Sequence, residues 1–407
     1  MSKPLQLSFF SVLLPLAFCL LAAWGLTRLS KDRATQGRDT RIDGLRGFLA
    51  LAVFFSHFVG LYYFQLTGQW GNLPYPFFAH AGAVAVCLFF MVTGYLFWSK
   101  MLEKRGHMDW VSLYISRIFR ITPLYWFMTV VIVAVVFWMS HLQILVPIKL
   151  LVRQILIWLS FTDYPNINKY KETVSIVFGV IWTIRYEWAF YLTLPFQALF
   201  ILWSEKFRPA LWLLAAIAVG ISIRPIYIDA LHISTFYAIY FLAGALGAWL
   251  VRVEKARNLA KSWIATCIGV VSLMAAFTLF NTDFVFTQAI FIGVFFIVIA
   301  GGNSLFGLLE NKPAALLGEI SYSVYLLHGI LIFILYTALF PRYFSLQTTA
   351  LQLYGNMAGV GMLVVLSCWL TYNLIEQPFI KLGRRLAHAL QRKEVKKLER
   401  TATNEGA

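Results

Sequence analysis

Charged residues are scarce in this chain of 407 residues, and acidic residues are scarcer than basic ones. Asp, Glu, Lys and Arg together make up 13% of the sequence, against 60% for the hydrophobic residues. Soluble domains carry about 25% charged residues. A composition this poor in charge excludes an ordinary soluble protein and indicates a polytopic membrane protein.

The sequence also lacks the patterns that hold disulfides, metals or nucleotides. Its cysteines, Cys19, Cys87, Cys267 and Cys368, lie singly inside apolar segments, a spacing that supports neither a disulfide framework nor a metal site. We interpret them as small buried hydrophobic residues. Zinc-ligand spacing, a phosphate-cradling glycine loop and a nucleophile elbow are all missing, so no metal is expected.

Basic residues give the chain a net charge of +16. Such a charge could indicate nucleic-acid binding, but the Lys and Arg residues lie in short connections and a tail between apolar runs. That is the positive-inside pattern of a membrane protein. We therefore expect no nucleic-acid partner, and we expect membrane lipids around the chain.

Apolar runs near the ~20 residues that a crossing needs predict an all-α transmembrane helical bundle of about 11 spans. The predicted spans are 8–28, 45–65, 77–99, 113–138, 177–203, 209–225, 233–251, 263–281, 284–300, 317–340 and 353–375. The first could also be a signal peptide. However, Ala22-Ala23 offers a weak cleavage pattern and the basic flank follows the run, so an uncleaved span is predicted.

Loop charge orients these spans. Basic residues gather in alternate connections, such as those around Lys31 and Lys104, whereas 66–76 and 281–284 contain none. The basic connections of a membrane protein face the cytoplasm. The N-terminus is therefore predicted outside and the C-terminus in the cytoplasm.

One outer connection contains a further apolar stretch, 145–161, which carries Lys149 and Arg153 one turn apart. A crossing here would invert the orientation of every later loop. We therefore predict an interfacial or re-entrant helix, and the sequence does not decide between the two.

Arg46 and His57 belong to one predicted helix, 45–65. At about 100° per residue, the eleven steps between them return to nearly the same azimuth, so both side chains share one face. The rise between them is roughly 16 Å, about half the hydrocarbon thickness. A surface cation and an imidazole half-way across suggest a path into the bilayer. His57 suits general-base work on a hydroxyl, and a buried structural histidine is the alternative.

Arg117 and Arg120 lie three residues apart at the cytoplasmic end of the span 113–138, and so face the same side of the helix. We predict that their two guanidinium groups bind phosphate together. The alternative is that both side chains extend to the membrane surface and anchor the helix there. Arg46 is expected at the same membrane face. Three arginines gathered there would suit a polyphosphorylated ligand.

Two further spans carry polar residues that are costly in a membrane unless paired or hydrated. Arg185 and Glu187 lie two residues apart, so they point to different faces and should pair with other elements. A structural network and a catalytic role for Glu187 both stay open.

His328 is expected at a depth similar to His57, so the two could share a cavity, or His328 could be a satisfied core residue. Glu376 is expected to be solvated or to pair with basic loops.

Five pieces of the sequence then occur together in one order. They are Asp43-Gly-Leu-Arg46 with His57, Arg117-x-x-Arg120, Trp182…Glu187…Phe190-Tyr191, Ser321-Tyr-Ser-x-Tyr-Leu-x-His328 and Tyr372-x-x-Ile-Glu376-x-Pro378-Phe379. Together they resemble the acyltransferase-3 family of integral-membrane O-acyltransferases. Members of this family are bacterial proteins that acylate cell-envelope glycans such as lipopolysaccharide O-antigen, capsule or exopolysaccharide.

The resemblance implies a division of the chain into three parts. Residues 1–42 would be an additional N-terminal transmembrane helix with a basic cytoplasmic linker, 43–380 a ten-helix membrane acyltransferase core, and 381–407 a basic cytoplasmic tail. The tail would lie on the anionic inner leaflet or be solvated. The location implied is the bacterial inner membrane, with the N-terminus in the periplasm.

The resemblance also implies a reaction. An acyl group, with acetyl the one expected, would pass from cytoplasmic acyl-CoA (acetyl-CoA) to a hydroxyl of an envelope glycan or lipid-linked saccharide. Arg46, Arg117 and Arg120 would bind the donor phosphates. His57 would be the catalytic residue, assisted or oriented by Glu187 or His328. An acyl-histidine intermediate is the rival to direct transfer.

A membrane transporter or flippase of an acyl or glycan precursor is the alternative function. It too needs polar groups inside the membrane, but it predicts paired inverted repeats or broken helices, which the sequence does not display. The acceptor glycan, the position acylated and the oligomeric state are not predicted.

Overall fold

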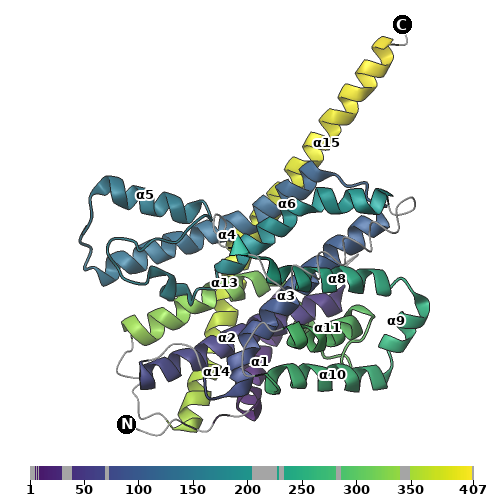
Figure 1. Ribbon diagram of the computed structural model, residues 1–407. Helices are drawn as coiled ribbons and strands as arrows, with labels where there is room; N and C mark the ends of the chain where they lie inside the picture. The colour runs from purple at the N-terminus through teal and green to yellow at the C-terminus, as the bar shows by residue number, and fades with distance from the viewer. Residues whose placement is uncertain are drawn as a thin grey trace.

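The computed structural model describes residues 5, 7, 9–29, 39–68, 73–203, 227–228, 233–280, 286–339 and 349–405. Their helices are η1 Phe9–Val12, α1 Leu13–Leu29, α2 Thr40–Thr67, α3 Pro76–Glu103, α4 Trp110–Met139, α5 Ile148–Leu159, η2 Thr173–Val177, α6 Trp182–Trp203, η4 Thr235–Tyr237, α8 Ala238–Leu250, α9 Glu254–Ala260, α10 Trp263–Thr278, α11 Phe286–Ala300, α12 Lys312–Glu319, α13 Ser321–Phe333, η5 Ile334–Leu339, α14 Ala350–Thr371, η6 Tyr372–Glu376 and α15 Gln377–Glu405. Strands β1 (Tyr227–Ile228) and β2 (Ile233–Ser234) form a short antiparallel pair. The prediction of an all-α protein is confirmed (Figure 1).

Several of these helices are long and apolar enough to cross a membrane. Five pass that test within the described residues, and seven do so if α8 with α9 and α12 with α13 each count as one bent span. Helices α10 and α11 are apolar but shorter. A polytopic helical bundle is therefore confirmed. The number of 11 spans stays a prediction, and the expected span 209–225 lies outside the described residues.

Helix α5 lies at the edge of the bundle beside α4 (Figure 1). It has 12 residues, a length of about 18 Å at 1.5 Å per residue, which is too short for a ~30 Å hydrocarbon core. Leu151 and Trp158 are its buried residues. This length agrees with the expectation that the stretch 145–161 does not cross.

Helix α1 is part of the bundle, since it packs against α14 and α12. A Cβ added at Gly361 of α14 would lie 2.7 Å from the sulfur of Cys19, so the two helices meet closely at a small residue. Cys19 is buried here, as expected. The interpretation of all cysteines as buried is wrong for Cys267, which is exposed because it lies on the outward apolar face of α10.

The packing of α2 against α12 positions the part of the bundle that carries the motifs. A Cβ at Gly318 of α12 would lie 2.0 Å from the backbone oxygen of Asp43 on α2, and one at Gly44 would lie 2.0 Å from the backbone oxygen of Leu309. Only glycine allows such a backbone approach. The chain then bends by 70° between α12 and α13. Helix α13 therefore enters the bundle beside the turn of α2 that carries Arg46.

Candidate active site

A cavity of about 410 Å³ lies among α2, α3, α4, α6, α13 and α15, at the end of the bundle where α2 and α4 begin and α3 ends. Each helix lines it with residues three or four positions apart, which share one helical face. On α6, for example, these residues are Thr183, Glu187 and Tyr191. The cavity therefore extends along the helices for at least two turns.

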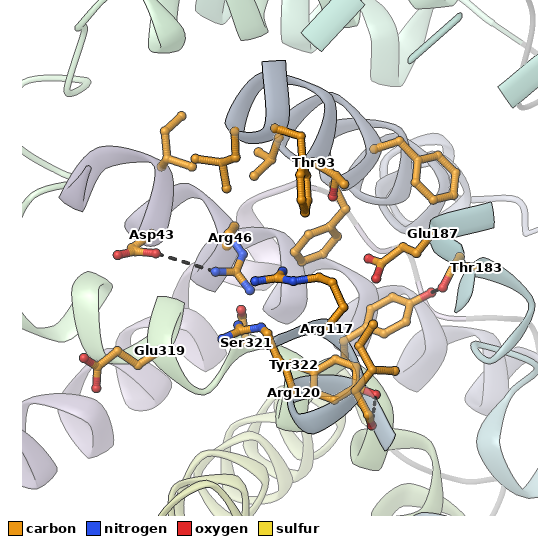
Figure 2. A pocket seen from close by; sticks show the side chains of 18 of the residues that line it. Asp43, Arg46, Thr93, Arg117, Arg120, Thr183, Glu187, Glu319, Ser321 and Tyr322 are labelled. Carbon is orange, nitrogen blue, oxygen red and sulfur yellow. Dashed lines mark hydrogen bonds and ion pairs between the residues drawn. The ribbon is translucent and has the colours of Figure 1, made fainter. Parts of the chain in front are cut away.

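The predicted phosphate-binding residues Arg46, Arg117 and Arg120 all line this cavity. Figure 2 shows their guanidinium groups gathered in its middle. Arg46 pairs with Asp43 at 3.6 Å between Nη1 and Oδ1. Arg117 lies over the ring of Phe97, 5.3 Å from its centre. Neither Arg117 nor Arg120 has an ion-pair partner among the described residues, so both guanidinium groups are available to an anionic group in the cavity. Carboxylates line the cavity too, at Asp39, Asp43, Glu187 and Glu319.

Glu187 lies at the side of the same cavity (Figure 2). Its Oε2 atom accepts a hydrogen bond of 3.2 Å from the hydroxyl of Tyr191. Arg185 points elsewhere, as its spacing predicted. It pairs with Asp163 at 3.8 Å and lies 4.5 Å from the ring centre of Tyr164. Glu187 therefore belongs to the arginine-lined cavity. Arg185 instead links α6 to the connection that follows α5.

His57 and His328 do not line the cavity, but they contact each other deeper in the bundle. His57 Nδ1 lies 2.8 Å from His328 Nε2, and the two rings are stacked with their centres 5.1 Å apart. His328 is fully buried, and its Nδ1 lies 2.8 Å from the backbone oxygen of Val324. The two histidines, which the sequence places at a similar depth, therefore contact each other, although neither lines the cavity.

These contacts determine which nitrogen atoms carry protons in the neutral pair. The carbonyl of Val324 can only accept, so His328 donates to it from Nδ1–H. Nε2 of a neutral His328 is then an acceptor, and His57 donates to it from Nδ1–H. Nε2 of His57 is left without a proton. It is the nitrogen that is available to act as a base.

Phe178 holds the imidazole of His57 from another side. The two rings stack at 18° with their centres 5.4 Å apart. Phe178 has left-handed backbone angles, φ 50° and ψ 28°, which are uncommon for a bulky residue and cluster at functional sites. A Cβ at Gly329, next to His328, would lie 2.8 Å from the backbone of Val177, so α13 and η2 meet closely here. The His57 ring is therefore fixed by packing as well as by hydrogen bonding.

Tyr325 and Thr183 also line the cavity. Their hydroxyl groups lie 3.0 Å apart, and Tyr325 also donates to the backbone oxygen of Val180 at 3.0 Å. Tyr325 precedes His328 on α13 by three residues, a rise of about 4.5 Å. Tyr325 therefore joins the cavity wall to the segment of α13 that carries His328, while the path from Arg46 to His57 stays a prediction.

Two residues in or near this cavity take positions that the sequence did not predict. Arg384 of α15 lines it, although nothing local distinguishes Arg384 from its neighbour Arg385. Glu376 is buried in η6, where Oε1 accepts a hydrogen bond from Ser323 and Oε2 has no partner. The expectation that Glu376 is solvated is wrong, because the π-helical turn of η6 directs it inward.

A comparison with protein-family models matches residues 39–374 to an acyltransferase domain. That match covers most of the chain, so the protein belongs to the acyltransferase-3 family and is a membrane acyltransferase. Comparisons with curated proteins and with solved structures gave no match. The described residues contain no cluster of His, Cys, Asp and Glu that could hold a metal ion.

Proposed function

We propose that this acyltransferase transfers an acetyl group from acetyl-CoA in the cytoplasm to a hydroxyl of a cell-envelope glycan. The observation that carries the proposal is the convergence of Arg46, Arg117 and Arg120 in one cavity, together with a hydrogen-bonded histidine pair deeper in the bundle. Acyl-CoA matches this arrangement because its phosphates and its thioester lie at opposite ends of a flexible arm. That arm is about long enough for the roughly 16 Å between Arg46 and His57.

The hydrogen bonds suggest direct transfer with His57 as the general base. His57 Nε2 takes the proton of the acceptor hydroxyl as its oxygen attacks the thioester carbonyl. The C–S bond then breaks, and the CoA thiolate receives the proton from His57. His328 stabilises the protonated imidazole by accepting from Nδ1–H, as the orienting carboxylate of a serine hydrolase does. Trapping a labelled acetyl group on His57 would instead establish the acyl-histidine route.

His328 and Glu187 receive different roles in this proposal. His328 contacts the base directly and is a positioning residue for it. Glu187 lies among the arginines and is hydrogen-bonded by Tyr191, so we assign it to organising the donor cavity. The family match favours this reading over a transporter, since it covers an acyltransferase domain.

The proposed location is the bacterial inner membrane, with the N-terminus in the periplasm. Loop charge supports this orientation, and the cavity lies at the same end of the bundle as the basic connection after α3. Acetyl-CoA would enter from there. The glycan acceptor would then approach His57 from the opposite side, past η2 and Phe178.

The experiment that tests the proposal measures O-acetyl groups on envelope glycans in cells that express the wild-type protein or His57→Ala at matched levels. We expect His57→Ala to lower acetylation by at least ~100-fold, the usual contribution of a general base. His107→Ala is the matched control, because His107 is exposed in the connection between α3 and α4. Unchanged acetylation in His57→Ala would show that His57 is not the general base.

A further inference from the structure

We infer that Arg384 is a fourth donor-binding residue, which contacts the 3′-phosphate on the ribose of the CoA donor. This inference rests on the proposed function, because it assumes an acyl-CoA in the cavity. It goes further by placing part of the donor site on α15, outside the matched domain of residues 39–374. It also explains how the cavity would distinguish CoA from thioesters with fewer phosphates.

The first observation is the close packing of α15 on α4 beside Arg384. A Cβ added at Gly383 would lie 2.6 Å from the Cβ of Phe119. Phe119 lies between Arg117 and Arg120 in the sequence. The absence of a side chain at Gly383 therefore brings the next residue, Arg384, to the segment that carries two of the cavity arginines.

A second contact fixes the same pair of helices about two turns further along. Gln391 of α15 donates hydrogen bonds to the carboxylate of Asp109 and to the hydroxyl of Ser112, the latter at 3.1 Å. Asp109 also caps the start of α4 by accepting from the backbone N–H of Ser112 at 2.9 Å. These two contacts, eight residues apart, hold α15 antiparallel to α4 and fix Arg384 at the cavity, while the end of α15 projects away from the bundle (Figure 1).

Charge gives the third observation. Arg384 lines the cavity and has no hydrogen-bond or ion-pair partner among the residues whose side chains the structure describes. Arg385 is also exposed but does not line the cavity, because successive residues of a helix point about 100° apart. An arginine that lacks a partner and lines a cavity together with three other arginines is suited to a phosphate.

The order of chemical groups along acyl-CoA indicates which phosphate Arg384 contacts. With the thioester toward His57, the pantetheine arm comes next, then the diphosphate, and finally the 3′-phosphate on the ribose. Arg46, Arg117 and Arg120 are partly buried, whereas Arg384 is exposed. Arg384 is therefore the outermost of the four and meets the outermost phosphate.

The test compares the affinities of acetyl-CoA and acetyl-3′-dephospho-CoA for the full-length protein, measured by calorimetry in neutral-lipid nanodiscs. We expect the wild-type protein and Arg385→Ala to prefer acetyl-CoA by roughly tenfold, the effect of one charge-assisted hydrogen bond. Arg384→Ala should bind both ligands equally. Gly383→Ala should also reduce the preference, because its new Cβ meets Phe119 and displaces α15.

The possible results distinguish the role of Arg384 from the identity of the donor. If Arg384→Ala keeps the wild-type preference, or weakens both ligands to the same degree, the role of Arg384 is wrong while acetyl-CoA stays the donor. If the wild-type protein binds neither ligand, the proposed donor itself is wrong and the inference about Arg384 falls with it.

Discussion

At the scale of single residues, the hydrogen bonds around His57 define what each histidine can do. The Val324 carbonyl accepts from His328, and His328 in turn accepts from His57, which leaves one basic nitrogen on His57. Phe178 packs on the same ring. In the proposed mechanism, His57 is therefore the base and His328 is the residue that sets its tautomer and orientation.

This division of roles predicts a specific kinetic effect for His328→Ala. Loss of the acceptor for His57 Nδ1–H should lower kcat by about 100-fold or more, by analogy with the orienting member of a catalytic triad. KM for acetyl-CoA should be unchanged, because His328 does not line the cavity. Steady-state kinetics with purified protein would measure both constants.

His328→Gln provides the control for this prediction. The glutamine carbonyl can accept a hydrogen bond from His57, so it should restore part of kcat. A purely structural role for His328 predicts equal losses in the two variants. A raised KM with unchanged kcat in His328→Ala would contradict the positioning role.

At the scale of elements, close backbone contacts position the cavity. Gly318 and Gly44 allow α2 and the chain around α12 to touch, and the bend after α12 then directs α13 toward the histidines. Gly383 does the same for α15 and α4. The side chains that line the cavity thus depend on small residues that touch no ligand.

Substitution of Gly318 tests this dependence. In Gly318→Ala the new Cβ would lie 2.0 Å from the backbone oxygen of Asp43, so α2 and α12 must move apart. Overpacking of this kind typically destabilises a protein by about 1–3 kcal/mol. We expect a lower midpoint of thermal unfolding in detergent and weaker acetyl-CoA binding, because Arg46 lies one turn from the contact.

Gly355→Ala on α14 is the matched control, since nothing lies within 4 Å of a Cβ at that position. Its unfolding midpoint and its affinity for acetyl-CoA should match those of the wild-type protein. If Gly318→Ala behaves like Gly355→Ala in both measurements, the contact between α2 and α12 does not position the cavity.

At the scale of the whole molecule, the sequence predicts what depends on composition and helical period. Apolar runs predicted the bundle, and helical spacing predicted that Arg117 and Arg120 face one side. Counting residues from one membrane face placed His57 and His328 at one depth, and the structure joins them by a hydrogen bond. These features follow from the regular rise and rotation of a helix.

The features that were missed depend on contacts between distant segments. Arg384 lines the cavity because Gly383 packs against Phe119, more than 250 residues away in the chain. Glu376 is buried because a π-helical turn changes the period at that point. The position of Tyr325 in the cavity wall depends on its hydrogen bonds with Thr183 of α6 and with the backbone of Val180. No pattern within one segment contains this information.

At the scale of the whole molecule, we propose that the basic end of the bundle is the donor side and that the histidine pair is the place of transfer. Labelled acetyl-CoA does not cross a membrane, so membrane vesicles of defined orientation can test both claims together. The wild-type protein should label its glycan in inverted vesicles, which present the cytoplasmic face, and not in sealed right-side-out vesicles.

The double variant Arg117→Ala with Arg120→Ala should raise the acetyl-CoA concentration that gives half-maximal labelling by tenfold or more. The control is Lys149→Ala with Arg153→Ala on exposed α5, which should leave this concentration unchanged.

The most direct measurement is the rate of label transfer by His57→Ala in these inverted vesicles at saturating acetyl-CoA. We expect a loss of at least ~100-fold that no donor concentration restores, because the base is missing while the arginine cavity is intact. Transfer at the wild-type rate would contradict this expectation, since His57 would then take no part in the chemistry.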